Sequence, residues 1–261
     1  MKTGFIGAGN MGGALARAVK GKCDILICDA LKEKAAALAR EVNGTVADNL
    51  TAAREADWLF LAVKPYLASE VIGGIKEVLK GRAEPPVIVS MLAGVSISEL
   101  EALLPEGMPI IRIMPNIPAA TGNGMMMYAK NALVSDEKAN EFVDLMADSG
   151  EILPMAEKLI DAGSAISGCG PAFVALFIEA LADAGVACGL SRVDALKLVE
   201  ATVSGTARHM LQTGMHPGVM KDAVCSPGGT TIQGVRALEE GGFRASAMNA
   251  VIKAYEKTVN K

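Results

Sequence analysis

The sequence changes its pattern near residue 155, and this change constrains the fold more than any single motif does. Up to residue 154, short β-rich apolar runs alternate with segments of helical periodicity. Such alternation is typical of a parallel sheet with crossover helices, which is a doubly wound α/β domain. Beyond residue 156 no strand pattern occurs, and the chain reads as successive helices. We therefore predict an α/β domain over residues 1–155 and an all-helical domain over residues 156–261.

The two patterns also predict where the individual elements lie. Strands are expected at residues 3–6, 24–28, 45–46, 58–63, 87–90, 110–114, 124–128 and 152–154. Helices are expected at residues 11–19, 32–41, 67–79, 97–103, 137–146, 160–165, 171–187, 192–213, 217–224, 231–239 and 245–259. Helix 171–187 is apolar around most of its circumference but is interrupted by Glu179 and Asp183, so we expect a buried helix and not a bilayer span. Its apolar surface exceeds what a small helical domain can cover, which predicts a helical dimer interface.

Charge and composition exclude several classes of function. The formal net charge is −4, the pI is near 5.4 and Lys and Arg form no cluster, which argues against nucleic acid and favours a small soluble ligand. The start of the chain lacks the pattern of a signal peptide, so we expect a cytoplasmic protein with reduced thiols and no membrane partner. Two histidines and five cysteines without CxxC spacing predict no metal site.

A glycine-rich segment, residues 7–12 with the sequence GAGNMG, joins the first expected strand to the first expected helix. In this context Gly7 allows a tight turn, Gly9 lets the backbone approach a pyrophosphate, and Gly12 permits close packing of helix on strand. This is typical of a Rossmann-like dinucleotide-binding domain. The candidate cofactor-binding residues are Ile6, Gly7, Ala8, Gly9, Asn10, Met11, Gly12, Asp29, Asn49, Ala62, Val63, Lys64, Pro65 and Ala93.

Asp29 ends the second expected strand, where a carboxylate accepts hydrogen bonds from the adenine-ribose hydroxyls and repels a 2′-phosphate. Lys32 and Lys34 follow closely enough to attract that phosphate, although the first turn of a solvated helix needs no such function. The expected cofactor is NADPH or NADH. Our hypothesis is that NADH is used at least as well as NADPH.

Three further residues have two interpretations each. Lys64 ends the fourth strand, where it is either a solvated cation or a cation over the ribose and phosphates of the cofactor. Asn49 follows the third strand and either contacts the cofactor or caps a helix. Arg112, in the sixth strand, either forms a structural ion pair or touches a phosphate.

The segment from Ser226 to Thr231, with the sequence SPGGTT, combines small hydroxyl side chains with two glycines. If Thr230 or Thr231 opens the next helix, the unpaired N–H groups at the helix start hold a small carboxylate. The alternative is a turn that only caps a helix. Because the segment lies in a helical domain that follows a nicotinamide-binding sheet, we favour a carboxylate clamp.

These motifs together identify a family. The chain resembles the pyrroline-5-carboxylate reductases over nearly its whole length, and the last two of the supporting segments are the most specific. The segments are residues 4–12 (GFIGAGNMG), 60–65 (FLAVKP), 112–116 (RIMPN), 167–173 (SGCGPAF), 216–222 (HPGVMKD), 226–231 (SPGGTT) and 241–244 (GGFR).

The resemblance implies a Rossmann-like domain, a helical domain that interlocks with a second subunit in a homodimer, and reduction of 1-pyrroline-5-carboxylate to L-proline by NAD(P)H. This reaction is the last step of proline biosynthesis. It further implies that the substrate carboxylate is held by Ser226, Gly228, Gly229 and Thr230, and that Thr231 lies near the imine nitrogen as the catalytic residue.

The chain departs from the family's usual residues at two positions, and two rival functions stay open. The family usually has serine at Cys169 and often tyrosine at Phe173, so a hydroxyl role is lost at both positions. Thr231 either orients a protonated substrate or relays a proton, with helix N-capping as the alternative. One rival function is a related hydroxy-acid oxidoreductase, but such enzymes carry a catalytic lysine that residues 163–173 lack. The other rival is a non-catalytic dinucleotide-binding dimer.

Overall fold

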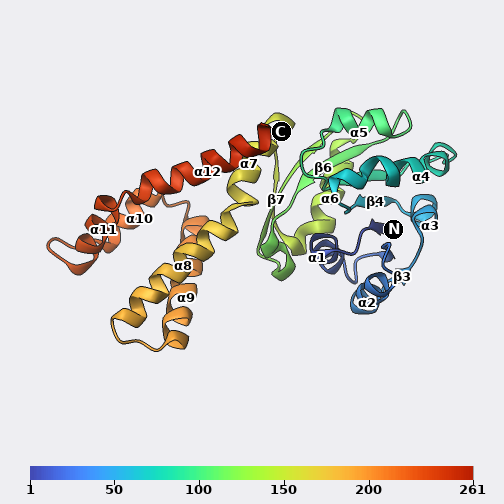
Figure 1. Ribbon diagram of the computed structural model, residues 1–261. Coiled ribbons are helices and arrows are strands. Elements are labelled where there is room, and N and C mark those ends of the chain that lie inside the picture. The colour runs from blue at the N-terminus through green and yellow to red at the C-terminus, as the bar shows by residue number, and fades with distance from the viewer. Residues whose placement is uncertain (261) are drawn as a thin grey trace. The chain divides into compact units, whose positions relative to one another are not determined.

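The computed structural model describes residues 1–260, within which eight strands form one sheet (Figure 1). The strands are β1 (Lys2–Ile6), β2 (Asp24–Cys28), β3 (Thr45–Val46), β4 (Trp58–Leu61), β5 (Val87–Ser90), β6 (Ile110–Met114), β7 (Gly124–Lys130) and β8 (Gly150–Pro154). Their order across the sheet is β3-β2-β1-β4-β5-β6-β7-β8. The order reverses between β1 and β4, which makes the carboxyl ends of these two strands the expected ligand edge.

Helices cover both faces of the sheet because the strands are apolar on both sides. Along β1, Phe5 belongs to one core cluster and Ile6 to the other, as the alternation of side chains in a strand requires. The first cluster takes in α1 (Asn10–Ala18), α2 (Lys32–Val42) and α6 (Asp136–Met146). The second takes in α3 (Asn49–Glu55), α4 (Ala68–Lys80), α5 (Ile97–Leu103) and Ile160 of α7 (Ile160–Ser167). The predicted doubly wound α/β architecture is therefore confirmed.

Two features of this domain differ from the sequence prediction. Strand β7 runs antiparallel to β6, with Ile113 opposite Tyr128, whereas a parallel sheet is predicted. The link between these strands contains only the 3-10 helix η2 (Ile117–Thr121), which is too short for the crossover that parallel pairing needs. Helix α3 is absent from the prediction, although Asp48 accepts the N–H of Thr51 at 2.7 Å as a side-chain cap.

The chain divides into two compact units, one formed mainly by residues 1–168 and the other by Cys169–Lys257. The boundary predicted near residue 155 precedes η4 (Glu157–Leu159) and α7, both of which belong to the first unit. The helices of the second unit are α8 (Gly170–Ala187), α9 (Arg192–Thr213), α10 (Pro217–Val224), α11 (Thr230–Glu240) and α12 (Phe243–Val259). The all-helical character predicted for the second half of the chain is thus confirmed.

Helix α8 is largely uncovered, so the expectation that it is buried is wrong for the single chain. Its side chains Val174 and Leu176 are 44% and 67% exposed. The helix packs along α9 and meets α12 at a ring pair between Phe177 and Phe243, with 5.7 Å between centroids. A helix that is apolar all round needs partners on every side. These two neighbours leave much of the apolar circumference of α8 without a contact.

Among residues 1–260, the stretch Glu157–Ala187 is the single segment long and apolar enough to cross a membrane by length and composition, with a mean hydropathy of 1.7. It comprises η4, α7 and α8. An exposed apolar surface of this kind serves either a lipid or a protein partner.

Candidate active site

The glycine-rich loop joins β1 closely to α1 and β4. Gly7 has a φ of 115°, which L side chains rarely adopt, and a Cβ there would strike the carbonyl oxygen of Ala62 after β4. A Cβ on Gly12 would strike the carbonyl oxygen of Gly7. Both glycines are therefore required by the packing of the protein itself.

Gly9 differs from these two glycines because its surroundings are open. A Cβ on Gly9 would meet no atom within 4 Å, and the residue is exposed. Gly9 is the N-cap of α1, and no side chain accepts a hydrogen bond from the N–H groups at this helix start. The first N–H groups, including those of Asn10 and Met11, are thus available beside open space, which suits the pyrophosphate of a dinucleotide.

Asp29 directly follows β2 and is tied to the glycine-rich loop. One carboxylate oxygen, Oδ2, accepts the N–H of Ala8 at 2.8 Å, and the other, Oδ1, accepts the N–H of Leu31 at 2.9 Å. The N–H of Gly7 donates to the carbonyl of Cys28 at 2.8 Å. The loop and the end of β2 are consequently held together as one rigid platform.

The remaining candidate cofactor residues gather at the same edge of the sheet. Parallel pairing places Ile6 opposite both Cys28 and Leu61, so the segments after β1, β2 and β4 leave the sheet together. These segments and those after β3 and β5 hold Asp29, Asn49, Ala62, Val63, Lys64, Pro65 and Ala93. Strand β4 ends two residues earlier than predicted, at Leu61.

Two of these residues are placed in more detail by the structure. Lys64 is exposed and forms the N-cap of the 3-10 helix η1 (Pro65–Leu67), which the proline stiffens. Asn49 is the first residue of α3 and is only partly exposed. The alternative role of Asn49 as a helix cap is wrong, because Asp48 is the cap.

The thiol at this edge, Cys28, is buried. Burial raises the pKa of Cys28 to about 12, and the nearby charge of Asp48 adds to the shift. The Cys28 Sγ lies 3.3 Å from the Asp48 carbonyl oxygen. In the described part of the chain, no group of three His, Cys, Asp or Glu side chains is placed to hold a metal ion.

Arg112 forms a structural ion pair, which decides between its two interpretations. Its side chain is 4% exposed, and its guanidinium contacts Glu157 Oε1 at 3.3 Å and Asp161 Oδ1 at 2.8 Å. Glu157 Oε1 also accepts the N–H of Ile97 at 2.6 Å. Arg112 therefore anchors η4 and α7 to β6 and lies within the first unit.

Asn116 holds two distant segments of the first unit together. The sequence gives only a weak signal of this role, because a Pro-Asn pair directly after a strand indicates no more than a turn. Its amide donates to the carbonyl of Ser167 at 3.0 Å, and its Oδ1 accepts the N–H of Met125 at 2.9 Å. Ser167 is the last residue of α7 and immediately precedes the glycine-rich start of α8. Asn116 thus fixes the end of α7 against the start of β7.

The segment from Ser226 to Thr231 forms a tight turn that leads into α11. The N–H of Gly229 donates to the carbonyl of Ser226 at 3.0 Å, and Gly228 has a φ of 71°. With Pro227 at the second position these are the features of a type II turn, which requires a positive φ at the third. A Cβ on Gly229 would strike the Ser226 Oγ, so this hydroxyl lies directly against the turn.

Helix α11 begins at Thr230, and Gly229 is its N-cap. The interpretation of Thr231 as the N-cap is therefore wrong. No side chain caps this helix start, and Thr230 and Thr231 are exposed, with no hydrogen bond from either hydroxyl among residues 1–260. The turn thus presents free N–H groups and free hydroxyls at the positive end of a helix dipole, which is an anion-binding arrangement.

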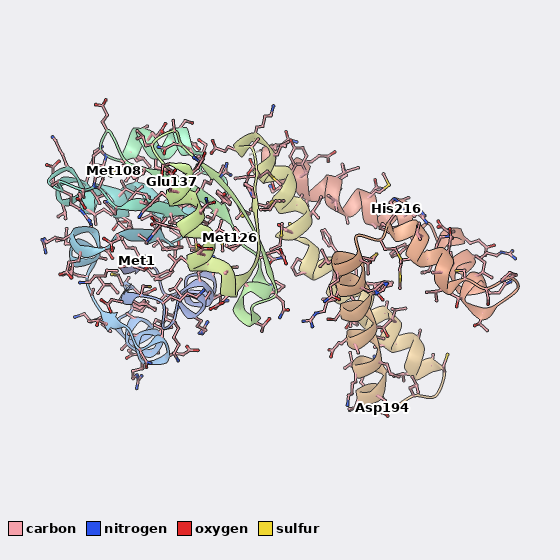
Figure 2. The ribbon with its side chains drawn as sticks, turned by 180° about the vertical axis from the view of Figure 1, so that it is seen from behind. Met1, Met108, Met126, Glu137, Asp194 and His216 are labelled. Atoms are coloured by element: carbon pink, nitrogen blue, oxygen red, sulfur yellow. The ribbon has the colours of Figure 1, made fainter. Side chains whose placement is uncertain are left out.

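Both histidines lie in the second unit. His216, labelled in Figure 2, is the N-cap of α10. Its Nδ1 accepts the N–H of Gly218 at 3.1 Å. His209 lies exposed within α9. Cys169 occupies the N-cap position of α8 and makes no side-chain cap hydrogen bond there.

Comparison with known proteins relates both units to one kind of enzyme. Residues 157–261 match the family model described as pyrroline-5-carboxylate reductase dimerisation, and residues 2–94 match that of NADP oxidoreductase coenzyme F420-dependent. The pyrroline-5-carboxylate reductase of Escherichia coli K12 is 40% identical, over 98% of this chain and 97% of the relative. The pyrroline-5-carboxylate reductase of Methanosarcina acetivorans is 42% identical, over 98% of this chain and 96% of the relative.

Among solved structures, a pyrroline carboxylate reductase from Plasmodium falciparum with NADP bound matches with a TM-score of 0.86 and 34% identity, covering 99% of this chain and 97% of that one. With two curated relatives at 40% identity or more over nearly the full length, the chain belongs to the pyrroline-5-carboxylate reductase family.

Proposed function

We propose that this protein reduces 1-pyrroline-5-carboxylate to L-proline with NADH or NADPH as the reductant. The observation that carries the proposal is the turn from Ser226 to Thr231, whose uncapped N–H groups suit the carboxylate of the substrate. The named relatives at 40% and 42% identity support the reaction, and the NADP bound to the Plasmodium protein supports the cofactor class.

The glycine-rich loop and the residues around it suit the dinucleotide. The N–H groups at the start of α1 would bind its pyrophosphate beside Gly9, and Asp29 would bind its adenine ribose. Lys64, exposed at the same edge, would lie near the negatively charged part. When bound, the nicotinamide supplies a hydride, so the protein needs neither a nucleophile nor a metal ion for the reduction.

The substrate is oriented through its carboxylate. Backbone N–H groups of Thr230 and Thr231 and the Ser226 hydroxyl would hold the two carboxylate oxygens, which fixes the ring in one pose. Gly228 and Gly229, also expected at the carboxylate, would shape the turn, because the Gly229 N–H already donates to the Ser226 carbonyl. The hydride adds to the imine carbon while the nitrogen carries a proton, so no nitrogen anion forms. The Thr231 hydroxyl, which has no other partner, would hydrogen-bond at that nitrogen and either orient the protonated imine or relay a proton from water.

The exposed apolar surface of α8 supports a homodimer. Val174 and Leu176 are exposed in the single chain, and residues 157–261 match a dimerisation model. A second copy of the helical unit would cover this surface, which explains the apolar segment without a membrane. The net charge of −4 and the lack of a basic cluster argue against a nucleic-acid partner. We place the dimer in the cytoplasm.

The test of the reaction is a spectrophotometric assay. Adding 1-pyrroline-5-carboxylate to the protein with NADH or NADPH should consume the reduced cofactor and form proline in equal amounts. Reduced cofactor that stays unchanged with both nucleotides would reject the proposal and favour a non-catalytic dinucleotide-binding dimer.

Two variants assign the role of the Thr231 hydroxyl. Thr231→Ala should lower kcat/KM by roughly 10- to 100-fold, because a misplaced ring loses the near-attack geometry, while the Kd for NADH stays unchanged. Thr231→Ser keeps the hydroxyl and should recover most of the activity. If the alanine variant turns over as the wild type does, Thr231 has no part in the mechanism.

A further inference from the structure

We infer that Asn116 is a positioning residue for the hydride transfer, because its amide fixes the end of α7 beside the nicotinamide half of the cofactor. The inference rests on the proposed function for the reaction itself. It assigns a role to the segment 112–116, with the sequence RIMPN, which the binding of pyrophosphate and of the substrate carboxylate does not use.

The side chain of Asn116 joins three segments of the first unit. Asn116 lies just beyond the end of β6, at the carboxyl edge of this strand. Its Nδ2 donates to the carbonyl of Ser167 at 3.0 Å, and its Oδ1 accepts the N–H of Met125 at 2.9 Å. A side-chain amide carries a donor and an acceptor, so these two partners use both ends of the group and determine its orientation.

These hydrogen bonds differ from those that asparagine usually makes at such a position. Asn116 is the N-cap of η2, yet its side chain makes no cap hydrogen bond. Asparagine is favoured at N-caps because its side chain accepts an N–H of the first turn. Here the amide bonds instead to Ser167 and Met125, which are 51 and 9 positions away in the sequence. The side chain therefore holds distant segments and does not start a helix.

The same segment also attaches the other end of α7. Arg112 contacts Asp161, in the first turn of α7, at 2.8 Å. Asn116 holds Ser167, the last residue of that helix. Side chains alternate along an extended chain, so Arg112 and Asn116 lie on the same face, which α7 covers. Helix α7 is thus attached at both of its ends to β6 and the residues that follow β6.

The place of this attachment matches the nicotinamide half of the cofactor. With the pyrophosphate at the start of α1 and the adenine ribose at the end of β2, the other half of a dinucleotide extends over the ends of β4, β5 and β6. Asn116 lies at that edge. The end of α7 is closely packed, since the N–H of Gly168 donates to the Ser164 carbonyl at 2.8 Å and a Cβ on Gly168 would also lie 2.8 Å from this oxygen.

Ser167 also lies where the chain leaves the first unit. The second unit begins at Cys169 and carries the turn from Ser226 to Thr231. The bond from Asn116 therefore fixes both the surroundings of the hydride donor and the point from which the chain continues to the substrate turn. A misplacement of about 1 Å costs on the order of 100-fold in rate. Loss of the amide should slow the chemical step and leave the pyrophosphate site unchanged.

The test compares two variants of Asn116 by steady-state kinetics of the full-length protein. Asn116→Ala removes both hydrogen bonds, whereas Asn116→Asp keeps the acceptor for Met125 and loses the donor for Ser167. Both variants should lower kcat by roughly 10- to 100-fold, while the Kd for NADH stays within about twofold of the wild type. With NADH deuterated at C4 of the nicotinamide, the isotope effect on kcat should rise, because hydride transfer then limits turnover.

Asn131 provides the matched control. It is partly buried like Asn116 and follows β7 at the opposite end of the β6–β7 pair. Its Oδ1 accepts the Ile110 N–H at 3.1 Å, and its Nδ2 donates to the Met108 carbonyl at 3.0 Å. Asn131→Ala therefore removes hydrogen bonds of the same kind away from the ligand edge. It should lower Tm as Asn116→Ala does, but keep kcat within about twofold of the wild type and leave the isotope effect unchanged.

The outcomes separate this inference from the proposed function. Asn116 variants that keep the kcat and the isotope effect of an active wild type would overturn the inference and leave the proposed function standing. An equal loss of kcat in Asn131→Ala would also overturn it, since the effect would then follow from lost stability. If Asn116→Ala does not fold, Asn116→Asp decides, because it keeps one of the two bonds. A wild type without reductase activity would reject the proposed function and this inference with it.

Discussion

The two glycines Gly9 and Gly12 lie three residues apart, yet adding one methyl group to each should have opposite consequences. The Cβ of Gly9→Ala meets no atom of the protein within 4 Å, and its φ of −74° and ψ of −175° are allowed for alanine. We therefore expect an unchanged free energy of unfolding. The methyl would occupy the space that a pyrophosphate needs, so the Kd for NADH should rise at least about 10-fold.

Gly12→Ala should damage the fold instead. Its Cβ would strike the carbonyl oxygen of Gly7 and would lie 3.0 Å from the Ala62 Cβ. A backbone oxygen cannot rotate away, so overpacking costs up to about 3 kcal/mol, against a gain of about 1 kcal/mol from helix propensity. The net loss of up to about 2 kcal/mol lowers Tm by roughly 4–8 °C in a unit of this size.

The assays are urea or thermal unfolding, followed by circular dichroism, and fluorescence titration with NADH, both on the same preparations. The expected pattern is a separation: weak binding with full stability in one variant, and reduced stability in the other. A Gly9→Ala variant that binds NADH as the wild type does would refute the placement of the pyrophosphate at the start of α1. A Gly12→Ala variant of unchanged stability would refute the packing argument.

Three further predictions concern other parts of the chain. Ser96→Ala removes a capping box in which Ser96 and Glu99 exchange hydrogen bonds, and it should lower the free energy of unfolding by about 1 kcal/mol in urea titrations. Because burial raises the pKa of Cys28 to about 12, this thiol stays protonated until the pH approaches that value. Alkylation at mildly alkaline pH, followed by mass spectrometry, should therefore modify the exposed Cys188 and spare Cys28 until the protein unfolds. Leu176→Glu should convert the dimer to a folded monomer in light scattering, since Leu176 is 67% exposed in the single chain, and an unchanged mass would exclude α8 from the interface.

Much of the fold follows from periodicity in the sequence. Helices α9 and α10 begin and end at the predicted residues. Ser191 caps the start of α9 and Gly214 follows its end, while His216 and Pro217 mark the start of α10. Strands β2 and β5 also match the prediction, because apolar runs mark them. The antiparallel β7 is different. The residues of β7 fit a parallel or an antiparallel strand equally well. Only the length of the connection to β6 distinguishes these two directions.

The burial of α8 shows a second limit of the sequence. Apolar residues all round a helix predict that something covers it, but they do not say whether the cover comes from the same chain. The prediction of a buried α8 is wrong for one chain for this reason, while the prediction of an interface from the same residues is in line with the dimerisation match.

The site is predictable where local backbone chemistry determines it. Glycines between a strand and a helix, and a Pro-Gly pair ahead of a helix, are compatible with few backbone conformations, so the sequence indicates both the Gly7 turn and the Gly228 turn. Hydrogen bonds between distant segments do not follow from spacing. The contact of Asn116 with Ser167 and the ion pairs of Arg112 join residues about 45 to 50 positions apart, which only the folded chain brings together.

The uncovered helices of the second unit also bear on how the protein is made. The sheet unit has two apolar clusters of its own and can fold while the rest of the chain is still on the ribosome. Within residues 169–257, by contrast, the fully covered apolar side chains are those of Ala182 and Ala195. In the homodimer that we propose, that half gains most of its hydrophobic stabilisation only when a second copy covers it. Active enzyme should therefore appear at a rate that depends on the square of the concentration of newly made chains, and a cell that makes few copies would hold them half-folded for longer.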